Sequence, residues 1–483
     1  MYTEYITQFI DRLVDNGNFK LWGARKLHTD RRTFLFDGGL PTRKQAERST
    51  RYQSLLNDYT RESMGKSLNL PPPFIVLVCQ QTLLRLSRDR GFNVHVVPGE
   101  ADGFCVRLAK EDEASYILSA DADFLVYTSE AGNFTPLQKF PTQWNEILSF
   151  PVYSHIRKEL GVSRANGMVE IAALLNEGAG LNVPQCIACV NKNQTLDYMS
   201  RKTLHEYIST YMAIEDFSPA PEIREMLNAG VLSGRVTELF FENEAPTYWL
   251  PLLPTSNPPR RTAWVISRPI RQAAYYQLRK RGWIRSDFVI EMVQRGQRVA
   301  EERVPIEELD DVCVVEDREQ IFVTAIRILL RNVPEKNFRY LLCFAGMFVL
   351  LQQSNPRTRS ASMPPELEYI TQQYQTIIYS LIILRQTQSP FSTDIPEFVS
   401  LWDLPRFKIA MAAPIGEGTE LWRRITANLD PALQNLCGSE SSTTASHSPK
   451  KIKKPKSADV ISNADSDQGN RFSRLAMLSP QGD

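Results

Sequence analysis

The chain has 483 residues, enough for two to three domains with a substantial hydrophobic core. Hydrophobic residues make up 42% and charged residues 23%, and the formal net charge of +1 excludes a chain that is basic over its whole surface, so any surface that binds nucleic acid is expected to be local. The most apolar stretch, residues 340–351, is too short to cross a bilayer, and no membrane partner is expected.

The first part of the chain alternates between short β-rich segments and helical patterns. This alternation is typical of an α/β domain with a parallel sheet. The first two predicted strands are each followed by a helical segment, as in strand–helix units. The predicted strands are 33–36, 93–97 and 115–119, and the predicted helices are 1–15, 42–66, 74–88 and 100–110.

The second half of the chain is predicted to be mostly helical, and a proline-rich stretch at 250–260 interrupts it. From residue 438 onward the chain is rich in Ser, Thr, Lys and Asp with few large apolar residues, which predicts a disordered tail. The expected domains are 1–190, 191–437 and 438–483. The clearest helices of the second half are predicted at 320–331, 338–353 and 366–385.

Five acidic residues follow three of the predicted strands. Asp37 comes directly after the strand at 33–36. Glu100 and Asp102 open the helix after the second strand, and Asp121 and Asp123 follow the third. Because the carboxyl ends of parallel strands meet along one edge of a sheet, these side chains are expected to converge there. Carboxylates so close together need cations, and oxygen ligands favour Mg²⁺ or Mn²⁺ over zinc.

Such a site suits phosphodiester hydrolysis, since two bound ions can activate a water molecule and stabilise the leaving oxygen. For any single one of the five residues a simpler interpretation is favoured, because Asp is common in turns and at helix N-termini. All five together at strand ends favour the metal site.

Several segments resemble one known family. Phe-Asp-Gly-Gly-Leu-Pro at 36–41, followed by Lys44 and Arg48, is similar to a segment of the flap endonucleases and their XPG relatives. Pro-Gly-Glu-Ala-Asp at 98–102 and Leu-Ser-Ala-Asp-Ala-Asp-Phe at 118–124 are closest to the asteroid branch of that superfamily. Ala-Trp-Val-Ile-Ser-Arg-Pro-Ile-Arg-Gln at 263–272 also resembles fungal asteroid-domain proteins.

The resemblance implies a PIN-like nuclease fold that binds two Mg²⁺ ions and cuts structured DNA, an activity of DNA repair. Lys44 and Arg48 match basic residues of the family that contact the scissile phosphate. A cation there stabilises charge that builds up in the transition state. The metal-site carboxylates of the family match Asp37, Glu100, Asp102, Asp121 and Asp123.

The sequence departs from the family pattern in several places. Family members have a first strand, ending in an essential Asp, before the helix that matches 3–15, and we expect this strand to be missing. Residues 19–33 stand where the family has a short link, and either an incomplete gene model or natural divergence accounts for both features. A further metal-site Asp is replaced in 174–178, where Glu177 would serve with a longer reach. The glycine-rich helix-hairpin that grips duplex DNA in flap endonucleases has no recognisable counterpart.

A run of basic residues with interleaved tyrosines follows the first motif. These cations could line a nucleic-acid channel, where they would neutralise phosphates while aromatic rings stack on bases. A solvated helix face explains the pattern equally well. The candidate nucleic-acid-binding residues are Arg43, Lys44, Arg48 and Arg51.

Two further basic groups occur later in the chain. The first, in 268–285 near Trp264 and Trp283, is interpreted as an ordinary surface helix. The second, at 450–456, is interpreted as a nuclear-localisation signal, with a solubilising tail or a DNA anchor as alternatives.

The seven cysteines are scattered, mostly within apolar segments, as is typical of reduced thiols in an intracellular protein. Cys186 and Cys189 have the spacing of a metal-binding pair. No second pair or nearby histidine completes a zinc site, so core packing is favoured.

The leading functional hypothesis is an asteroid-like, metal-dependent, structure-specific nuclease that acts on structured or single-stranded DNA ends and is weakened by the altered carboxylates. The alternative is a catalytically inactive PIN-like module that binds nucleic acid or protein. The helical half offers a surface for protein partners under either hypothesis.

Overall fold

The computed structural model divides the chain into two compact units. The first comprises Met1–Asp15, Asp30–Ala101 and Phe217–Ser439, and the second comprises Asn16–Thr29, Asp102–Asp216 and Glu440–Asp483. These units join segments across the expected boundary at residue 190, and the three-domain division stays a prediction. The residues that the structure describes are 20–21, 33–39, 44–63, 74–97, 99–111, 116–119, 121, 123–127, 133–136, 149–150, 153–154, 156–164, 166–177, 180–212, 246–253, 262–308, 318–334, 337–338, 340–341, 344, 365–388 and 416–426.

Some predicted features lie outside these residues. They include the helix at 1–15, Arg43, most of the helix at 338–353 and the tail with its basic cluster at 450–456.

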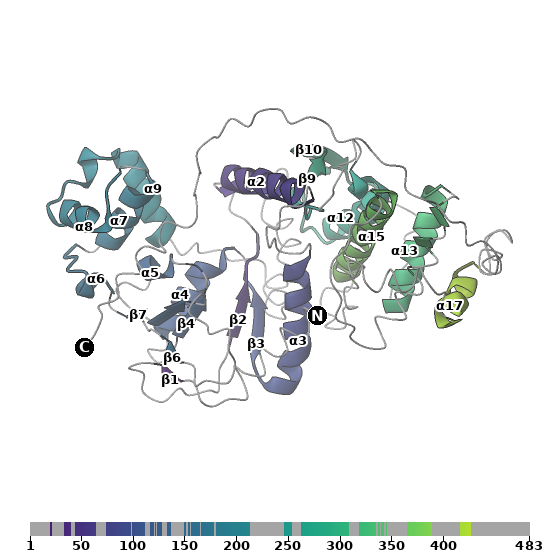
Figure 1. Cartoon of the computed structure of the whole chain (residues 1–483), viewed down its shortest axis with the longest axis horizontal. Coiled ribbons are helices and arrows are strands. Elements are labelled where there is room, and N and C mark those ends of the chain that lie inside the picture. Colours follow the sequence, from purple (N-terminus) through teal and green to yellow (C-terminus); the bar gives the residue numbers. More distant parts are fainter. Residues whose placement is uncertain are drawn as a thin grey trace, which may run out of the picture. The chain divides into compact units, whose positions relative to one another are not determined.

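The first unit begins with the predicted strand–helix pattern. Strand β2 (Thr33–Phe36) pairs in parallel with β3 (Asn93–Val96), in a register that sets Phe36 opposite Val96. Helix α2 (Gln45–Ser63) follows β2, and α3 (Ile75–Arg90) precedes β3 and lies beside it (Figure 1). The predictions of both strands and both helices are confirmed.

A glycine ends helix α3. Gly91 has a φ of 67°, and its N–H donates to the carbonyl of Ser87 over 3.1 Å, as at a left-handed helix cap. The chain then turns directly into β3, where Phe92 and Val94 pack against Leu83 and Leu86 of the helix. The helix is thereby held against the strand that follows it.

The second half of the chain contributes a three-stranded sheet that the sequence interpretation did not include. β8 (Thr247–Trp249) runs parallel to β9 (Phe288–Arg295), and β9 forms an antiparallel hairpin with β10 (Arg298–Pro305). Gly296 lies in the two-residue turn with a φ of 61°, a conformation that favours glycine. The expectation of a mostly helical second half is therefore only partly correct.

Helices pack around this sheet. The short helix η4 (Ala263–Ser267) leads into α12 (Arg268–Lys280), and α13 (Arg318–Asn332), α15 (Pro365–Gln388) and α17 (Gly416–Thr426) belong to the same core. α15 contacts α12, α13 and η4 and is buried along almost its whole length, although several of its buried residues are polar, among them Gln372, Gln375 and Ser380. The predicted helices at 320–331 and 366–385 are confirmed.

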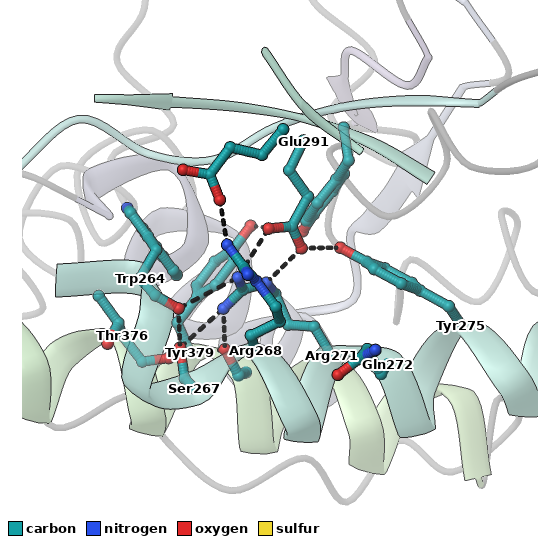
Figure 2. Close-up of polar contacts among 12 residues, drawn as sticks. Trp264, Ser267, Arg268, Arg271, Gln272, Tyr275, Glu291, Thr376 and Tyr379 are labelled. Atoms are coloured by element: carbon teal, nitrogen blue, oxygen red, sulfur yellow. Dashed lines mark hydrogen bonds and ion pairs between the residues drawn. The ribbon is translucent and has the colours of Figure 1, made fainter. Parts of the chain in front are cut away.

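One ion pair lies in the centre of this core. Arg271 of α12 donates to both carboxylate oxygens of Glu291 on β9, from Nε over 2.6 Å and from Nη2 over 2.7 Å (Figure 2). Its remaining N–H groups reach Ser267 Oγ, Ser380 Oγ and the Trp264 carbonyl. The side chains of the pair are fully buried, so the surface-helix interpretation of the basic group is wrong for Arg271.

Tyr275 completes the environment of the Glu291 carboxylate, to which its hydroxyl donates over 2.7 Å. Burial and the neighbouring Glu291 carboxylate raise the pKa of Tyr275 well above its usual value. Burial opposes the charge of Arg271, but the Glu291 carboxylate outweighs this effect and raises the pKa of that guanidinium. The polar groups at this point of the core therefore satisfy one another.

The second unit combines a small sheet with a group of helices. β4 pairs in parallel with β5, and β5 pairs antiparallel with β7. The predictions of a strand at 115–119 and a helix at 100–110 are confirmed. The elements are α4 (Ala101–Glu111), β4 (Tyr116–Ser119), α5 (Phe124–Tyr127), β5 (Asn133–Pro136), β7 (Tyr153–Ser154), α6 (Ile156–Glu159), α7 (Gly167–Asn176), α8 (Val183–Asn191), η3 (Thr195–Asp197), α9 (Arg201–Met212) and the pair β1 (Lys20–Leu21) with β6 (Ser149–Phe150).

Helix α8 has a well-defined start. The side chain of Asn182 accepts from the Gln185 N–H while the Gln185 side chain accepts from the Asn182 N–H, which forms a capping box. Cys186 and Cys189 are free, buried thiols in the core of the unit, and burial raises the pKa of Cys186 to about 11. The prediction that this pair packs in the core is confirmed. Within the described residues, none of the helices combines the length and apolar character needed to span a bilayer.

Candidate functional site

Asp37 stands at the carboxyl end of β2, where the chain leaves the sheet. The neighbouring backbone is fixed, because the Gly38 N–H donates to the Gly99 carbonyl over 2.7 Å. The Asp37 side chain accepts from the Ala101 N–H over 2.7 Å. Ala101 is the first residue of α4, so the exposed Asp37 carboxylate sits at a helix N-terminus, where the helix dipole favours an anion.

Glu100 lies immediately before this helix and pairs with Lys44. Lys44 Nζ lies 2.6 Å from Glu100 Oε1, and the two side chains retain 28% and 27% of their exposure. Asp37, Lys44 and Glu100 therefore occupy neighbouring positions where β2 and β3 end. The structure brings together these three residues of the sequence motifs.

Arg48 lies one helical turn after Lys44 on α2 and packs on an aromatic ring. Its guanidinium carbon is 6.0 Å from the ring centroid of Trp249, and the Trp249 Nε1–H donates to Gln45 Oε1 over 2.7 Å. Tyr52 meets the same tryptophan edge-to-face at a centroid distance of 4.9 Å. Trp249, which the sequence interpretation did not single out, thus holds the basic face of α2 in a defined position.

Arg51 differs from Arg48, because it points into solvent and pairs with Glu47 of the same helix. Its side chain keeps 79% of its exposure. An exposed pair of this kind contributes little to stability. Arg51 remains accessible to a phosphate.

Asp121 and Asp123 form a tight turn after β4 in the second unit. The Asp121 N–H donates to Ser119 Oγ over 3.1 Å, and Asp121 Oδ1 accepts from the Asp123 N–H over 2.9 Å. The Asp123 carbonyl then accepts from Val126 as α5 begins. Both carboxylates remain partly accessible to solvent.

Tyr211 of α9 holds the second of these carboxylates. Its hydroxyl donates to Asp123 Oδ2 over 3.0 Å, and its ring packs against Tyr127 at a centroid distance of 4.9 Å. Burial and the Asp123 carboxylate raise the pKa of Tyr211, so the phenol keeps the proton that it donates. The contact joins residues 88 positions apart, and no local pattern in the sequence points to it.

The two other candidate ligands occupy helix ends. Asp102 stands in the first turn of α4 and is half-buried. Glu177 follows the last residue of α7 and is exposed, with its N–H bonded to the Ala173 carbonyl over 2.9 Å. No three His, Cys, Asp or Glu side chains form a metal-binding group within the described parts of the chain. The expected five-carboxylate site stays a prediction.

The chemistry of the candidate ligands suits a hard cation. Asp37 and Glu100 in the first unit, like Asp121 and Asp123 in the second, offer carboxylate oxygens accessible to solvent. One oxygen of Asp37, Glu100 and Asp121 already accepts a hydrogen bond or ion pair from the chain itself. A cation that takes Glu100 must compete with Lys44.

A buried carboxylate that the sequence interpretation missed lies in α7. The side chain of Glu170 is 3% exposed, accepts from the Thr195 hydroxyl and lies 3.2 Å from Arg164 Nη1. Arg164 also donates to Asn193 Oδ1 over 2.6 Å. The network ties the segment before α7 to the turn after α8 and is therefore structural. A single acid in an otherwise apolar helix was the available signal.

Comparisons with known proteins agree with the motifs. The family described as XPG domain containing matches residues 71–306. Asteroid homolog 1 of Schizosaccharomyces pombe (strain 972) is 25% identical over 389 residues, which cover 76% of this chain and 71% of the relative. No solved structure matches the chain. The family match includes Glu100 and Asp121 and begins after Asp37 and Lys44.

Proposed function

Because the chain belongs to the asteroid family of XPG-like proteins, and an XPG domain implies a PIN-like α/β fold, we propose that it is a divalent-cation-dependent nuclease that acts on structured or single-stranded DNA ends. Its rate would be lower than that of a complete site, since Glu177 stands where the family has Asp. The coarser conclusion, a nuclease-like module, follows from the family alone.

The observation that carries the proposal is the grouping of Lys44, Glu100 and Asp37 at the carboxyl ends of two neighbouring parallel strands. Ligands of open parallel sheets bind at this end of the strands. A cation and two carboxylates there can receive both a phosphate and a metal ion. A purely structural ion pair does not need this position.

Each group has a defined part in the proposal. Asp37, Glu100, Asp102, Asp121, Asp123 and Glu177 would supply oxygen ligands, and Tyr211 would orient Asp123. Mg²⁺ or Mn²⁺, when bound, supplies a Lewis acid and an activated water. Lys44 would leave its ion pair with Glu100 and pair with a phosphate oxygen instead. Arg48, held on Trp249, would contact a neighbouring phosphate.

A second candidate function is a catalytically inactive module that binds DNA or protein. Two observations favour it: Lys44 neutralises Glu100, and no three metal-binding side chains gather among the described residues. The two functions differ in one respect, which is whether a cation activates DNA cleavage. A nuclear location, proposed from the basic cluster at 450–456, is compatible with both.

The test is cleavage of labelled flap, overhang and single-stranded DNA by the full chain with Mn²⁺, Mg²⁺ or EDTA. We expect weak cleavage that requires the cation and is abolished by the double substitution Asp121→Ala, Asp123→Ala. The matched control is Glu159→Ala, Asp197→Ala, which removes two exposed acids of the same unit. Absence of cleavage by the unmodified chain on all substrates would favour the inactive module.

A further inference from the structure

Four exposed basic side chains gather where α12 ends and β9 approaches. Arg279 and Lys280 form the last turn of the helix, Arg281 follows it, and Arg285 lies in the connection to the strand. The segment 279–287 contains four basic residues and one acid, Asp287, and so carries a net charge of +3. Asp287 pairs with Arg279 over 2.6 Å.

The backbone of this segment has one well-defined conformation. Gly282 has a φ of 75°, its N–H donates to the Arg279 carbonyl over 2.8 Å, and the Trp283 N–H donates to the Leu278 carbonyl over 3.0 Å. This pair of bonds is the Schellman arrangement, in which glycine takes the left-handed position. The basic side chains therefore project from a fixed turn.

Arg281 is itself held in place. Its guanidinium carbon lies 5.4 Å from the ring centroid of Trp283, and Nη2 donates to the carbonyl of Gln388 at the end of α15 over 3.1 Å. Trp283 is partly buried and also packs against the hydrophobic core. A cation fixed in this way loses less side-chain entropy when it binds an anion.

The favourable effect of cations at a helix C-terminus does not by itself explain the net positive charge of the segment 279–287. Carbonyl groups at a helix C-terminus favour cations in the last turn, which explains Arg279 and Lys280. Arg285 lies beyond the helix, and every additional exposed cation repels the others at low salt. A bound polyanion would remove this repulsion.

We propose that this turn is a contact surface for the phosphate backbone of a nucleic acid, outside the candidate cleavage site. The inference rests on the proposed function for the choice of nucleic acid as the polyanion. Recognition would be independent of sequence, because Arg281 and the core already cover much of Trp283 and the exposed groups are cations. A membrane surface fits less well, since the exposed large apolar side chains of the described residues (Val76, Leu108, Leu118, Leu196 and Tyr198) lie elsewhere in the sequence and not in this segment.

The experiment measures binding of a fluorescein-labelled oligonucleotide, single-stranded and as a duplex, to the full chain in EDTA over a series of KCl concentrations. The test variant is Lys280→Gln, Arg281→Gln, Arg285→Gln. The control, Arg327→Gln, Arg331→Gln, Arg423→Gln, removes three exposed cations from α13 and α17. A third variant, Lys280→Arg, Arg281→Lys, Arg285→Lys, keeps the charge and tests whether the turn still folds.

We expect the test variant to bind about tenfold more weakly or worse. The slope of its log affinity against log salt concentration should be shallower by about 2 for the single strand and about 3 for the duplex, as for three lost phosphate contacts. The charge-preserving variant and the control should bind like the unmodified chain. Equal weakening in the control, or unchanged affinity and salt slope in the test variant, would overturn the inference. Charge-dependent binding to phosphatidylserine vesicles without binding to DNA would overturn it as well.

The assay separates this inference from the proposed function. Binding in EDTA through the turn, without cleavage when Mn²⁺ is added, would support the surface and contradict the nuclease. Cation-dependent cleavage together with binding that ignores the turn would contradict the surface alone.

Discussion

Two ion pairs of the first unit share their chemistry and differ in their access to water. Arg271 and Glu291 are fully buried, with 0% exposure on both side chains, whereas Lys44 and Glu100 keep 28% and 27%. The buried pair is bidentate, and Ser267, Tyr275 and the Trp264 carbonyl surround it (Figure 2). Ser380 Oγ also accepts from Arg271.

The difference shows which pair can exchange partners. Separating two buried charges leaves each of them without solvation. The Arg271–Glu291 pair therefore stays intact as long as the protein is folded. A half-exposed pair contributes on the order of 1 kcal/mol, and water or a ligand can replace either partner. Lys44 and Glu100 are therefore suited to binding, and Arg271 and Glu291 to structure.

The largest expected effect follows from breaking the buried pair. Glu291→Gln leaves Arg271 charged and unpaired in the core, and we expect the free energy of unfolding to fall by about 3–5 kcal/mol. Urea unfolding followed by tryptophan fluorescence measures the change. Glu301→Gln, at an exposed position of the same hairpin, should stay within about 0.5 kcal/mol of the unmodified chain. Equal stability of the two variants would show that the buried pair is not structural.

The second effect concerns catalysis and the half-exposed pair of Lys44 and Glu100. Lys44→Met removes the cation beside Glu100, and we expect cleavage of DNA to fall about a hundredfold, since one lost electrostatic contact to the reacting phosphate has effects of that order. Stability should change by no more than about 1 kcal/mol. Lys202→Met, at a side chain that is 88% exposed on α9, serves as the control and should cleave normally. A large loss of stability with unchanged specific activity would assign Lys44 a structural role.

The third effect separates Tyr275 from the rest of the buried network. Tyr275→Phe removes a donor to a buried carboxylate, which we expect to cost about 1.5–3 kcal/mol. Because the pKa of Tyr275 is raised in the folded state, its contribution is present below the unfolded value of about 10 and is lost as the pH rises above it. The free energy of unfolding should therefore decrease less steeply with rising pH, from neutral to alkaline, for Tyr275→Phe than for the unmodified chain. Tyr198→Phe, at a side chain that is 49% exposed, should follow the unmodified chain.

The smallest effect concerns the exposed pair on α2. Arg51→Gln breaks the contact with Glu47, and we expect a change in unfolding free energy of about 0.3–0.5 kcal/mol. DNA affinity should weaken at low salt if Arg51 contacts a phosphate. Thermal melts and oligonucleotide binding measure the two quantities. A loss above about 2 kcal/mol would contradict the view that exposed pairs of this unit contribute little to stability.

Elements with regular hydrophobic spacing were predictable from the sequence. β2 has the predicted bounds, and α3 and α13 begin and end within two residues of the prediction. The sheet of the second half was not predictable in the same way, because β9 and β10 carry Glu291 and Glu302 at buried positions. An acid at a buried position interrupts the apolar pattern expected of a strand. The charges of these acids are neutralised by Arg271, Arg268 and Arg295, of which the first two lie outside the hairpin.

The candidate site was predictable at the level of motifs. Asp37, Lys44 and Glu100 follow from short segments, and the structure adds the contacts among them. Trp249 and Tyr211 could not be predicted, because each meets its partner through the fold and not through spacing along the chain. Binding of a cation by the carboxylates is the property that would connect the sequence motifs to the proposed nuclease activity.

Binding of Mn²⁺ to the full chain tests that property most directly. Electron paramagnetic resonance of free Mn²⁺ during a titration gives the number of ions that a protein binds. Three proteins are compared: the unmodified chain, the double variant Asp121→Asn/Asp123→Asn, and the control double variant Glu159→Gln/Asp197→Gln. We predict that the unmodified chain and the control bind Mn²⁺ in the same way and that the Asp121, Asp123 variant loses at least one ion. Equal binding by all three proteins, or free Mn²⁺ throughout the titration of the unmodified chain, would contradict the proposal that these carboxylates form a cation site.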